Sequence, residues 1–420
     1  LQGEAAPIVL LRSNSELADT VAPGTNLLGA MLANSGIQLR LLEMTGSALV
    51  ATSGNLSESP LIFDNTEATA VLGAVADCLL DHDLVLSQGL DDSIVRVIGN
   101  KPTTLRLGRG LAPTLHSLDS QLRLQGCGAQ LKANITLLGR GMLISGPFVG
   151  DLDTPAARQR YRSQKINLPK FFQLDSVEEV TDLHPDYGST IDADNRARCV
   201  PHHVAHALAC WFEHRQSVMP PFLALTWDGM GLGPDGSLWG GEFLYFDNQF
   251  RWHRAASVRP FAVPAGPELA RHPLRVAHAL AGQRFDGPAV HCSSVGRLIE
   301  GMAVLAGLPP ENDYEAKLAM RWEALASETN TATHMEFCTD KGELDWRPLL
   351  PVISDQSQAI ANRALGFHLA MARGAARLCR QQETTSVVLS GGVFQNKLLT
   401  ELLLGELETL GIRSLTHQAV

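Results

Sequence analysis

Two apolar segments that run directly into glycines constrain the fold of this 420-residue chain more than any other feature. Phe222–Trp227 leads into Asp228–Gly231, and Ser386–Ser390 leads into Gly391-Gly392. Short apolar runs bounded by turn residues are typical of buried strands, so we expect each glycine turn at the end of a sheet. Glycine amides can approach a phosphate group closely because no Cβ stands in the way. Two such turns favour a two-lobed nucleotide cleft over a Rossmann domain.

The rest of the chain alternates strands and helices, which indicates an α/β architecture. We expect further strands at 7–11, 93–98, 130–138, 142–145, 177–183 and 237–246. We expect helices at 66–80, 154–165, 203–214, 294–307, 313–327, 357–382 and 394–410. A chain of this length predicts two or three domains.

The composition narrows the choice of partners. The net charge of −10 and a pI near 5.8 argue against a nucleic-acid or anionic-membrane partner. No apolar run is long enough to cross a membrane. The seven cysteines form no CxxC pair, so we expect reduced thiols and a cytoplasmic protein.

His202 and His206 are the candidate metal ligands. They follow Pro201 in a helix-forming stretch, and an i, i+4 pair projects from one face of a helix. Two imidazoles so placed can hold one divalent ion, and imidazole suits iron and zinc alike. The alternative is a pair of core or helix-capping histidines. His203 lies off this face, and we expect it to orient the ligands or to face the substrate. No glutamate stands between the histidines, which disfavours a metalloprotease.

Asp228 is the candidate catalytic carboxylate, which could hold Mg²⁺ or supply a second metal contact beside the amides of Gly229 and Gly231. The alternative is a tight hairpin turn, in which Asp-Gly is routine. The Gly391-Gly392 turn is expected to open a helix, whose N-terminus attracts anions. Its alternative is an ordinary strand-to-helix turn. The chain contains no Walker loop.

The remaining candidates carry weaker signals. Ser53 and Asn55 lie in a hydroxyl-rich turn that could contact a nucleotide or could cap a helix. Arg109 can pair with phosphate oxygens, although exposed arginines are common. Lys132 falls in an expected strand, where a lysine usually faces solvent, and Asp151 falls in an expected loop.

Ten segments in a fixed order resemble the HypF carbamoyltransferase family, which matures nickel–iron hydrogenases. Any one of them is a modest signal, but the ordered set is highly specific and covers most of the chain. The segments are Thr52–Ser57, Asp91–Arg96, Gly108–Pro113, Gly150–Leu152, Asp182–Tyr187, His202–His206, Trp227–Gly229, Trp239–Phe243, Ser293–Arg297 and Ser390–Asn396.

This resemblance implies a fold with two parts. Residues 1–115 resemble a YrdC-like α/β domain that lacks its early part. Residues 120–420 resemble a Kae1-like domain of the actin, sugar-kinase and Hsp70 class, with two ribonuclease-H-like lobes at about 120–290 and 290–420. The family also carries an acylphosphatase domain and a zinc-finger-like segment before this region. Its Asn-Asp-Gly-Gly motif, which supplies a further metal carboxylate, would follow Val420.

The resemblance also implies an activity. In the family, the YrdC-like domain forms carbamoyl-adenylate from ATP and carbamate or carbamoyl phosphate. The Kae1-like domain passes the carbamoyl group to the C-terminal cysteine thiol of HypE, where it becomes the precursor of cyanide ligands. The implied cofactors are ATP, Mg²⁺ and a divalent iron or zinc ion.

The family's functional positions map onto this sequence residue by residue. His202 and His206 match its metal histidines. Six residues match its nucleotide- and carbamoyl-contacting segments, and two match part of the YrdC-like pocket. The six are Lys132, Asp151, Asp228, Gly391, Gly392 and Asn396, and the two are Ser53 and Asn55.

Two departures from the family pattern leave other functions open. Asn312–Lys317 replaces the usual Tyr-Glu-Gly-Gln run, and residues 27–44 lack the usual Pro-Tyr-Thr-Pro loop. One alternative is an O-carbamoyltransferase that acts on a small molecule. A threonylcarbamoyl transferase acting on tRNA is another, which the acidic balance disfavours. A truncated nucleotide-binding scaffold and a sugar kinase complete the set.

Overall fold

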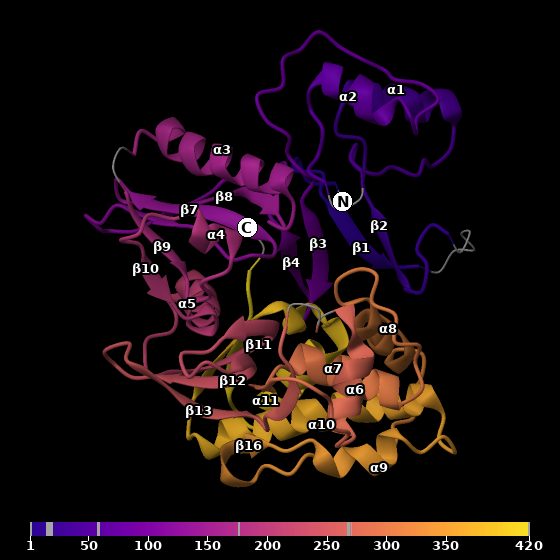
Figure 1. Cartoon of the computed structure of the whole chain (residues 1–420), viewed down its shortest axis with the longest axis vertical. Coiled ribbons are helices and arrows are strands. Elements are labelled where there is room, and N and C mark those ends of the chain that lie inside the picture. Colours follow the sequence, from indigo (N-terminus) through magenta and orange to yellow (C-terminus); the bar gives the residue numbers. More distant parts are fainter. Residues whose placement is uncertain are drawn as a thin grey trace.

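The structure, a computed structural model, describes residues 2–13, 20–56, 59–174, 177–266, 269 and 271–418. The N-terminal unit lies at one end of the long axis, and the C-terminal helices lie at the other (Figure 1). No helix among the described residues is long and apolar enough to span a membrane.

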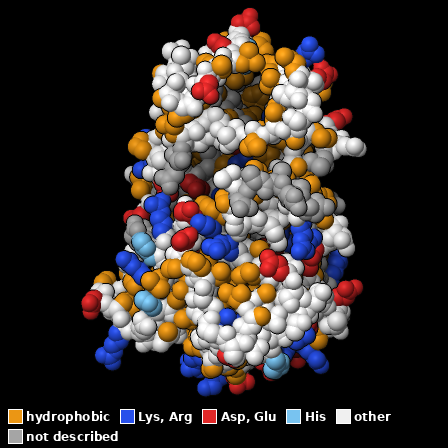
Figure 2. All heavy atoms as spheres, turned by 90° about the vertical axis from the view of Figure 1, so that its right-hand side faces the viewer, with side chains coloured by type: hydrophobic (Ala, Val, Ile, Leu, Met, Phe, Trp, Pro, Cys, Tyr) orange, Lys and Arg blue, Asp and Glu red, His pale blue; other side chains and the backbone are white. Residues whose placement is uncertain are grey.

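The N-terminal unit is built on a four-stranded sheet in the order β2-β1-β3-β4. Its elements are β1 (Ile8–Arg12), β2 (Leu27–Ala30), α1 (Gly36–Thr45), α2 (Asn65–Leu72), β3 (Ile94–Ile98) and β4 (Lys101–Arg106). Neither α1 nor α2 has a buried residue. Hydrophobic side chains consequently gather on the surface at this end of the molecule (Figure 2).

The first lobe of the remaining chain is a six-stranded sheet in the order β10-β9-β6-β7-β8-β5. Its strands are β5 (Thr114–Ser117), β6 (Leu124–Gly126), β7 (Ala133–Gly139), β8 (Met142–Gly150), β9 (Glu178–Asp182) and β10 (Arg198–Val200). Its helices are α3 (Pro155–Phe171) and α4 (Gly188–Ile191). Alternate residues of β7 are buried, as expected of a strand with one face on a core.

The second lobe is an eight-stranded sheet whose main path is β14-β15-β12-β11-β17-β18. Its strands are β11 (Phe222–Leu232), β12 (Leu238–Phe246), β13 (Trp252–Val258), β14 (Phe261–Pro264), β15 (Ala289–Cys292), β16 (Glu343–Leu344), β17 (Ser386–Ser390) and β18 (Arg413–Leu415). The helix between the two sheets in the chain is α5 (His202–His214). The helices that follow it are α6 (Pro273–Leu280), α7 (Val295–Leu305), α8 (Lys317–Ala326), α9 (Leu350–Ile353), α10 (Ile360–Gln381) and α11 (Lys397–Thr409). Short 3-10 turns cover Asp340–Gly342, Arg347–Leu349 and Gly392–Gln395.

The two lobes repeat one strand pairing. In each, the first strand pairs antiparallel with the second, the second pairs antiparallel with the third, and the first also pairs parallel with the fourth. The fourth strand then pairs parallel with the fifth. The first-lobe series is β6, β7, β8, β9, β10, and the second-lobe series is β11, β12, β13, β17, β18. This repeat is the ribonuclease-H-like arrangement that the sequence predicted for both lobes.

The boundary between the lobes differs from the expected position near residue 290. The first sheet ends with β10 and the second begins with β11, so the division falls between Val200 and Phe222. The expectation was wrong because the chain becomes mostly helical after residue 290, although β17 and β18 still join the second sheet. A change in local composition therefore did not mark a change of sheet.

Two expectations about local structure were also wrong. Lys132 lies in the turn before β7 with a positive φ of 51°, not within the strand. Asp228 does not end its strand, because β11 continues to Leu232 and pairs Gly231 with Trp239 of β12. The register shifts between Trp227 and Gly231, so the glycines form a β-bulge instead of a hairpin turn.

The N-terminal unit docks on the second lobe through a buried ion pair. Arg96 in β3 places Nη2 2.8 Å from Oε1 of Glu323 in α8, and both side chains are 9% exposed. Arg96 Nη1 also donates a 2.8 Å hydrogen bond to the carbonyl of Gln395. Lys397 donates to the carbonyl of Val97 at 2.9 Å. These contacts hold β3 beside the segment that follows the Gly391-Gly392 turn.

Candidate active site

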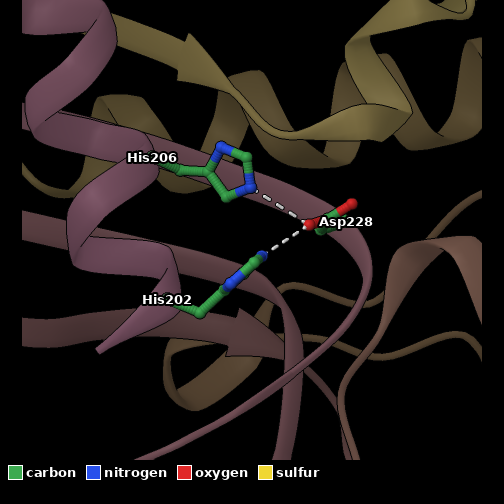
Figure 3. A group of neighbouring side chains, drawn as sticks. All are labelled: His202, His206 and Asp228. Carbon is green, nitrogen blue, oxygen red and sulfur yellow. Dashed lines mark hydrogen bonds and ion pairs between the residues drawn. The ribbon is translucent and has the colours of Figure 1, made fainter. Parts of the chain in front are cut away.

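Helix α5 and the bulge of β11 bring three metal-binding side chains together. His202 and His206 lie one turn apart on α5, and their Nε2 atoms are each 3.1 Å from Oδ2 of Asp228 (Figure 3). Each of the three offers one ligand atom, and these atoms lie within 4.8 Å of one another. The two rings and the carboxylate thus point toward one small space between α5 and β11.

The bulge fixes the direction of the Asp228 carboxylate. Its Oδ1 accepts hydrogen bonds from the amide of Gly229 at 2.8 Å and from the amide of Gly392 at 3.2 Å. Gly392 follows β17, the strand that pairs with β11. Because Oδ1 is held by two amides, Oδ2 is left to face the histidines. The two glycine turns found in the sequence therefore meet at one carboxylate.

Asp182 at the end of β9 orients the first histidine. Its Oδ2 lies 2.7 Å from Nδ1 of His202, and its Oδ1 accepts from the amide of His184 at 2.9 Å. A carboxylate bonded to one ring nitrogen fixes the tautomer that leaves the other nitrogen free for a metal. The first lobe therefore supplies the residue that orients a ligand on α5.

The three groups are strongly coupled electrostatically. Burial alone would lower the pKa of His202, but hydrogen bonds to Asp182 and Asp228 and their charges raise it to about 10. Burial lowers the pKa of His206. Burial would raise the pKa of Asp228, yet its bonds to the two histidines hold that pKa well below the usual range. An anionic carboxylate shared by two ring nitrogens needs a proton or a metal cation between them.

This donor set fits a divalent metal ion. Two imidazole nitrogens and one carboxylate oxygen suit zinc or iron, and Asp182 supplies the outer carboxylate that such sites use. Asp228 was expected to hold Mg²⁺ or to supply a second metal contact, and the structure groups it with the two histidines.

His203, which was expected to orient the ligands or to face the substrate, lies inside the fold. Its side chain is fully buried, and neither ring nitrogen has a hydrogen-bond partner among the described residues. Burial drives its pKa well below the usual value, so the ring is neutral. A Cβ on Gly231 would lie 2.8 Å from the His203 ring and 2.9 Å from the His202 ring. His203 therefore packs beneath the bulge and helps to set its position.

The two ends of the Gly391–Asn396 segment, the expected phosphate turn after β17, both have structural roles. Gly391 has a φ of 103°, and a Cβ there would lie 2.2 Å from the carbonyl oxygen of Trp227. Only glycine fits this close approach of β17 to β11. Asn396 caps α11 by accepting from the amide of Leu399 at 2.9 Å, and it also contacts His368 at 3.1 Å. Its side chain is thus already engaged within the fold.

Lys132 and Asp151 lie together across from the second lobe. Asp151 accepts from the Lys132 amide at 2.7 Å, and Lys132 Nζ lies 2.8 Å from Oε2 of Glu315. Burial raises the pKa of Asp151, with Glu315 adding to the shift. This ion pair bridges the two lobes beside α8.

The other predicted nucleotide contacts belong to the N-terminal unit. Ser53 and Asn55 hydrogen bond to each other, and Asn55 also donates to the carbonyl of Ser59 at 2.9 Å. Arg109 pairs with Asp92 at 2.7 Å and donates to the carbonyl of Ala6 at 3.1 Å. Arg109 therefore holds the start of the chain onto this unit, and the three residues do not join the histidine cluster.

Asp182 was not among the site residues predicted from the sequence. It falls in Asp182–Tyr187, one of the segments that carried the family resemblance. Asp182 stands 20 residues from His202 and meets it only through the pairing of β9 with β10, which leads into α5. A contact of this kind depends on the sheet and has no local spacing to reveal it.

The fold and the site together define a class of protein. Two ribonuclease-H-like lobes form one part, a small α/β unit is docked on the second lobe, and a His-His-Asp cluster lies between α5 and β11. Three family models match parts of the chain. "Telomere recombination", the model of the Sua5, YciO and YrdC proteins, matches residues 3–108. "HypF Kae1-like domain" matches residues 120–213. "Carbamoyltransferase, Kae1-like Domain, second subdomain" matches 224–288 and 283–420, which agrees with a lobe boundary before β11.

The chain belongs to the HypF carbamoyltransferase family. It is 31% identical to the carbamoyltransferase HypF homolog of Cupriavidus necator, covering 74% of this chain and 90% of that protein. It is also 31% identical to carbamoyltransferase HypF of Synechocystis, covering 99% of this chain and 61% of that relative. The chain spans about three fifths of the length of the first curated relatives it matches.

Two solved structures share the fold. A full-length HypF in a phosphate- and nucleotide-bound form matches all of this chain and 72% of that chain, with a TM-score of 0.90 and 27% identity. HypF of T. kodakarensis matches 99% of this chain and 60% of that chain, with a TM-score of 0.91 and 23% identity. The expectation of a YrdC-like unit joined to a Kae1-like domain is confirmed.

Proposed function

We propose that the chain is an ATP-dependent carbamoyltransferase of hydrogenase maturation. On this proposal, the N-terminal unit forms carbamoyl-adenylate from ATP and carbamate or carbamoyl phosphate. The two lobes then transfer the carbamoyl group to the C-terminal cysteine thiol of HypE. The observation that carries the proposal is the His202, His206 and Asp228 cluster, in a member of the HypF family whose YrdC-like unit is docked on the second lobe.

Each part of the site has a task in this reaction. His202, His206 and Asp228 would hold the divalent ion, which when bound supplies Lewis-acid polarisation of an oxygen. Asp182 keeps the free nitrogen of His202 directed at that ion. The glycine amides of the bulge favour negative charge nearby, and one such donor is worth roughly 3 kcal/mol to a developing oxyanion.

The chemistry requires no internal nucleophile. The acceptor thiol first gives up its proton to solvent, and its sulfur then attacks the carbamoyl carbon. The bond from that carbon to the phosphate oxygen breaks, and AMP leaves with the bonding electrons. A carbamoyl-adenylate hydrolyses readily, so the close docking of β3 on α8 and Gln395 supports a short path between the units.

Lys132 and Asp151 are proposed as nucleotide contacts from the first lobe. Lys132 forms the interlobe ion pair with Glu315, and its amide donates to Asp151. A phosphate could replace the Glu315 carboxylate as the partner of the Lys132 ammonium group. Ser53, Asn55 and Arg109 are proposed to serve the adenylate-forming step in the N-terminal unit.

The test supplies ATP and carbamoyl phosphate with two acceptors, the HypE protein and a small hydroxyl compound. We expect a carbamoyl adduct on the HypE cysteine and none on the hydroxyl compound, as measured by mass spectrometry. His206→Ala should abolish the adduct, whereas Gly405→Ala on α11, where a Cβ meets no atom within 4 Å, should leave it unchanged. An adduct on the hydroxyl compound alone would replace the proposal with an O-carbamoyltransferase.

A further inference from the structure

Arg297 on α7 is a buried cation with hydrogen-bond donors to spare. Its side chain is 7% exposed, and Nη2 makes a 2.9 Å ion pair with Oε1 of Glu300. Its Nε and Nη1 have no hydrogen-bond partner among the described residues. A guanidinium carries five N–H donors, and leaving a buried one unmade is costly. A buried arginine with unused donors is typical of a site that binds an anionic ligand.

The start of α7 is attached directly to the bulge that carries Asp228. The hydroxyl of Ser294 donates to the carbonyl of Asp228 at 2.9 Å, donates to the carbonyl of Gly229, and accepts from the amide of Arg297 at 3.1 Å. A Cβ on Gly296 would lie 2.9 Å from the α-carbon of Gly229. The positive end of an 11-residue helix therefore rests against the candidate site.

The guanidinium of Arg297 lies next to the bulge. A Cβ built on Gly229 would lie 3.9 Å from Nη2 of Arg297, which is van der Waals contact distance. On the other side of the bulge, a Cβ on Gly392 would lie 2.9 Å from Oδ1 of Asp228. Arg297 and the metal-binding carboxylate therefore both lie beside the glycines of the bulge.

Glu300 pairs with Arg297 through only one of its carboxylate oxygens. Its second oxygen, Oε2, has no partner in the described part of the chain, while Asn312 donates to Oε1 at 3.2 Å. Burial raises the pKa of Glu300, which Arg297 only partly offsets. Glu315, the partner of Lys132, adds to that shift, so the same charged network reaches the first lobe.

We propose that Arg297 and the N-terminus of α7 bind the phosphoryl oxygens of the substrate beside the Gly229 bulge. The ligand class is a phosphate ester or anhydride, with ATP and carbamoyl phosphate as its two possible sources. This inference rests on the proposed function and deepens it. It makes Arg297 a phosphate-binding residue beside the metal cluster.

The test is titration calorimetry of the metal-loaded chain with ATP and, separately, with carbamoyl phosphate. Arg297→Lys keeps a cation beside Glu300 but removes the planar fork, and we expect affinity for one or both ligands to fall by about 10- to 100-fold. Gly229→Ala should weaken binding of the same ligand, because it places a methyl group against the Arg297 guanidinium. Glu300→Gln removes the internal partner of Arg297, so affinity should be kept or increased. Gly405→Ala is the control for an added methyl group elsewhere.

The source of the phosphate is the ligand whose affinity depends on Arg297. Equal affinities of wild type and Arg297→Lys for both ligands would overturn the inference, as would a Glu300→Gln variant that weakens binding as much as Arg297→Lys. The proposed function is tested separately, by adduct formation on HypE. Phosphate binding that depends on Arg297 without any adduct would keep the inference and reject the function. An adduct on HypE, together with unchanged phosphate binding in Arg297→Lys, would keep the proposed function and reject the inference.

Discussion

Breaking the Arg96–Glu323 ion pair should release the N-terminal unit from the second lobe. Arg96→Met leaves Glu323 buried without a cation, at 9% exposure, and removes the 2.8 Å bond to the Gln395 carbonyl. Removal of one member of a buried pair costs about 3–5 kcal/mol. At roughly 1.4 kcal/mol for each factor of ten, docking weakens by about 10²- to 10³-fold or more. The double variant Arg96→Met/Glu323→Met should recover most of this loss, because it leaves no unpaired charge.

The assay is hydrogen exchange followed by mass spectrometry. Arg96→Met should raise exchange in β3 and α8 together and leave β7 of the first lobe unchanged. The matched control is Arg40→Met, which removes an Arg–Glu pair on α1 whose side chains are 72% and 54% exposed. Such exposed pairs contribute about 0–1 kcal/mol. Equal effects of Arg96→Met and Arg40→Met, or no recovery in the double variant, would refute the docking role of the buried pair.

Three further predictions concern the metal cluster, acid stability and the close approach of two strands. His206→Ala should abolish metal retention, and Asp182→Asn should weaken it by about 10- to 100-fold, as measured by metal analysis after dialysis; unchanged retention in both would reject the cluster as a metal site. Burial would raise the pKa of Asp192, but Arg162 and Arg158 lower it below 3.8, so this carboxylate stabilises the fold above that pH and the contribution is lost as pH falls through the lowered pKa. The melting-temperature gap between wild type and Asp192→Asn should therefore shrink from about pH 6 to about pH 3, and a gap that widens would contradict the sign. Gly391→Ala should destabilise the fold by more than about 2 kcal/mol in urea denaturation, whereas Gly405→Ala in a helix should stabilise it by up to about 1 kcal/mol; similar effects would reject the strained approach at Gly391.

The part of the site that depends on local spacing was predictable from the sequence. His202 and His206 are four residues apart in a helix-forming stretch, and α5 places them on one face as expected. The strands that lead into Asp228 and Gly391 were also predictable, because their apolar runs end at glycines.

The part that depends on strand pairing was not predictable. Asp228 and its glycines form a bulge only because β12 pairs with β11 on both sides of them. Asp182 reaches His202 through the sheet of the first lobe, and Arg297 reaches the bulge through the packing of α7. The lobe boundary was misplaced for the same reason, since helical composition after residue 290 conceals strands that return to the second sheet. No local pattern carries such contacts, whereas the ordered set of family segments did indicate a YrdC-like unit joined to a Kae1-like domain.

Carbamoyl transfer is tested by the intact mass of HypE after incubation with this chain, ATP and carbamoyl phosphate. We expect a gain of one carbamoyl group that requires ATP, maps to the C-terminal cysteine and disappears in Asp228→Asn, because that variant loses the anionic ligand shared by both histidines. No mass gain with wild-type chain that retains its metal, or an equal gain with Asp228→Asn, would refute carbamoyl transfer at this metal cluster.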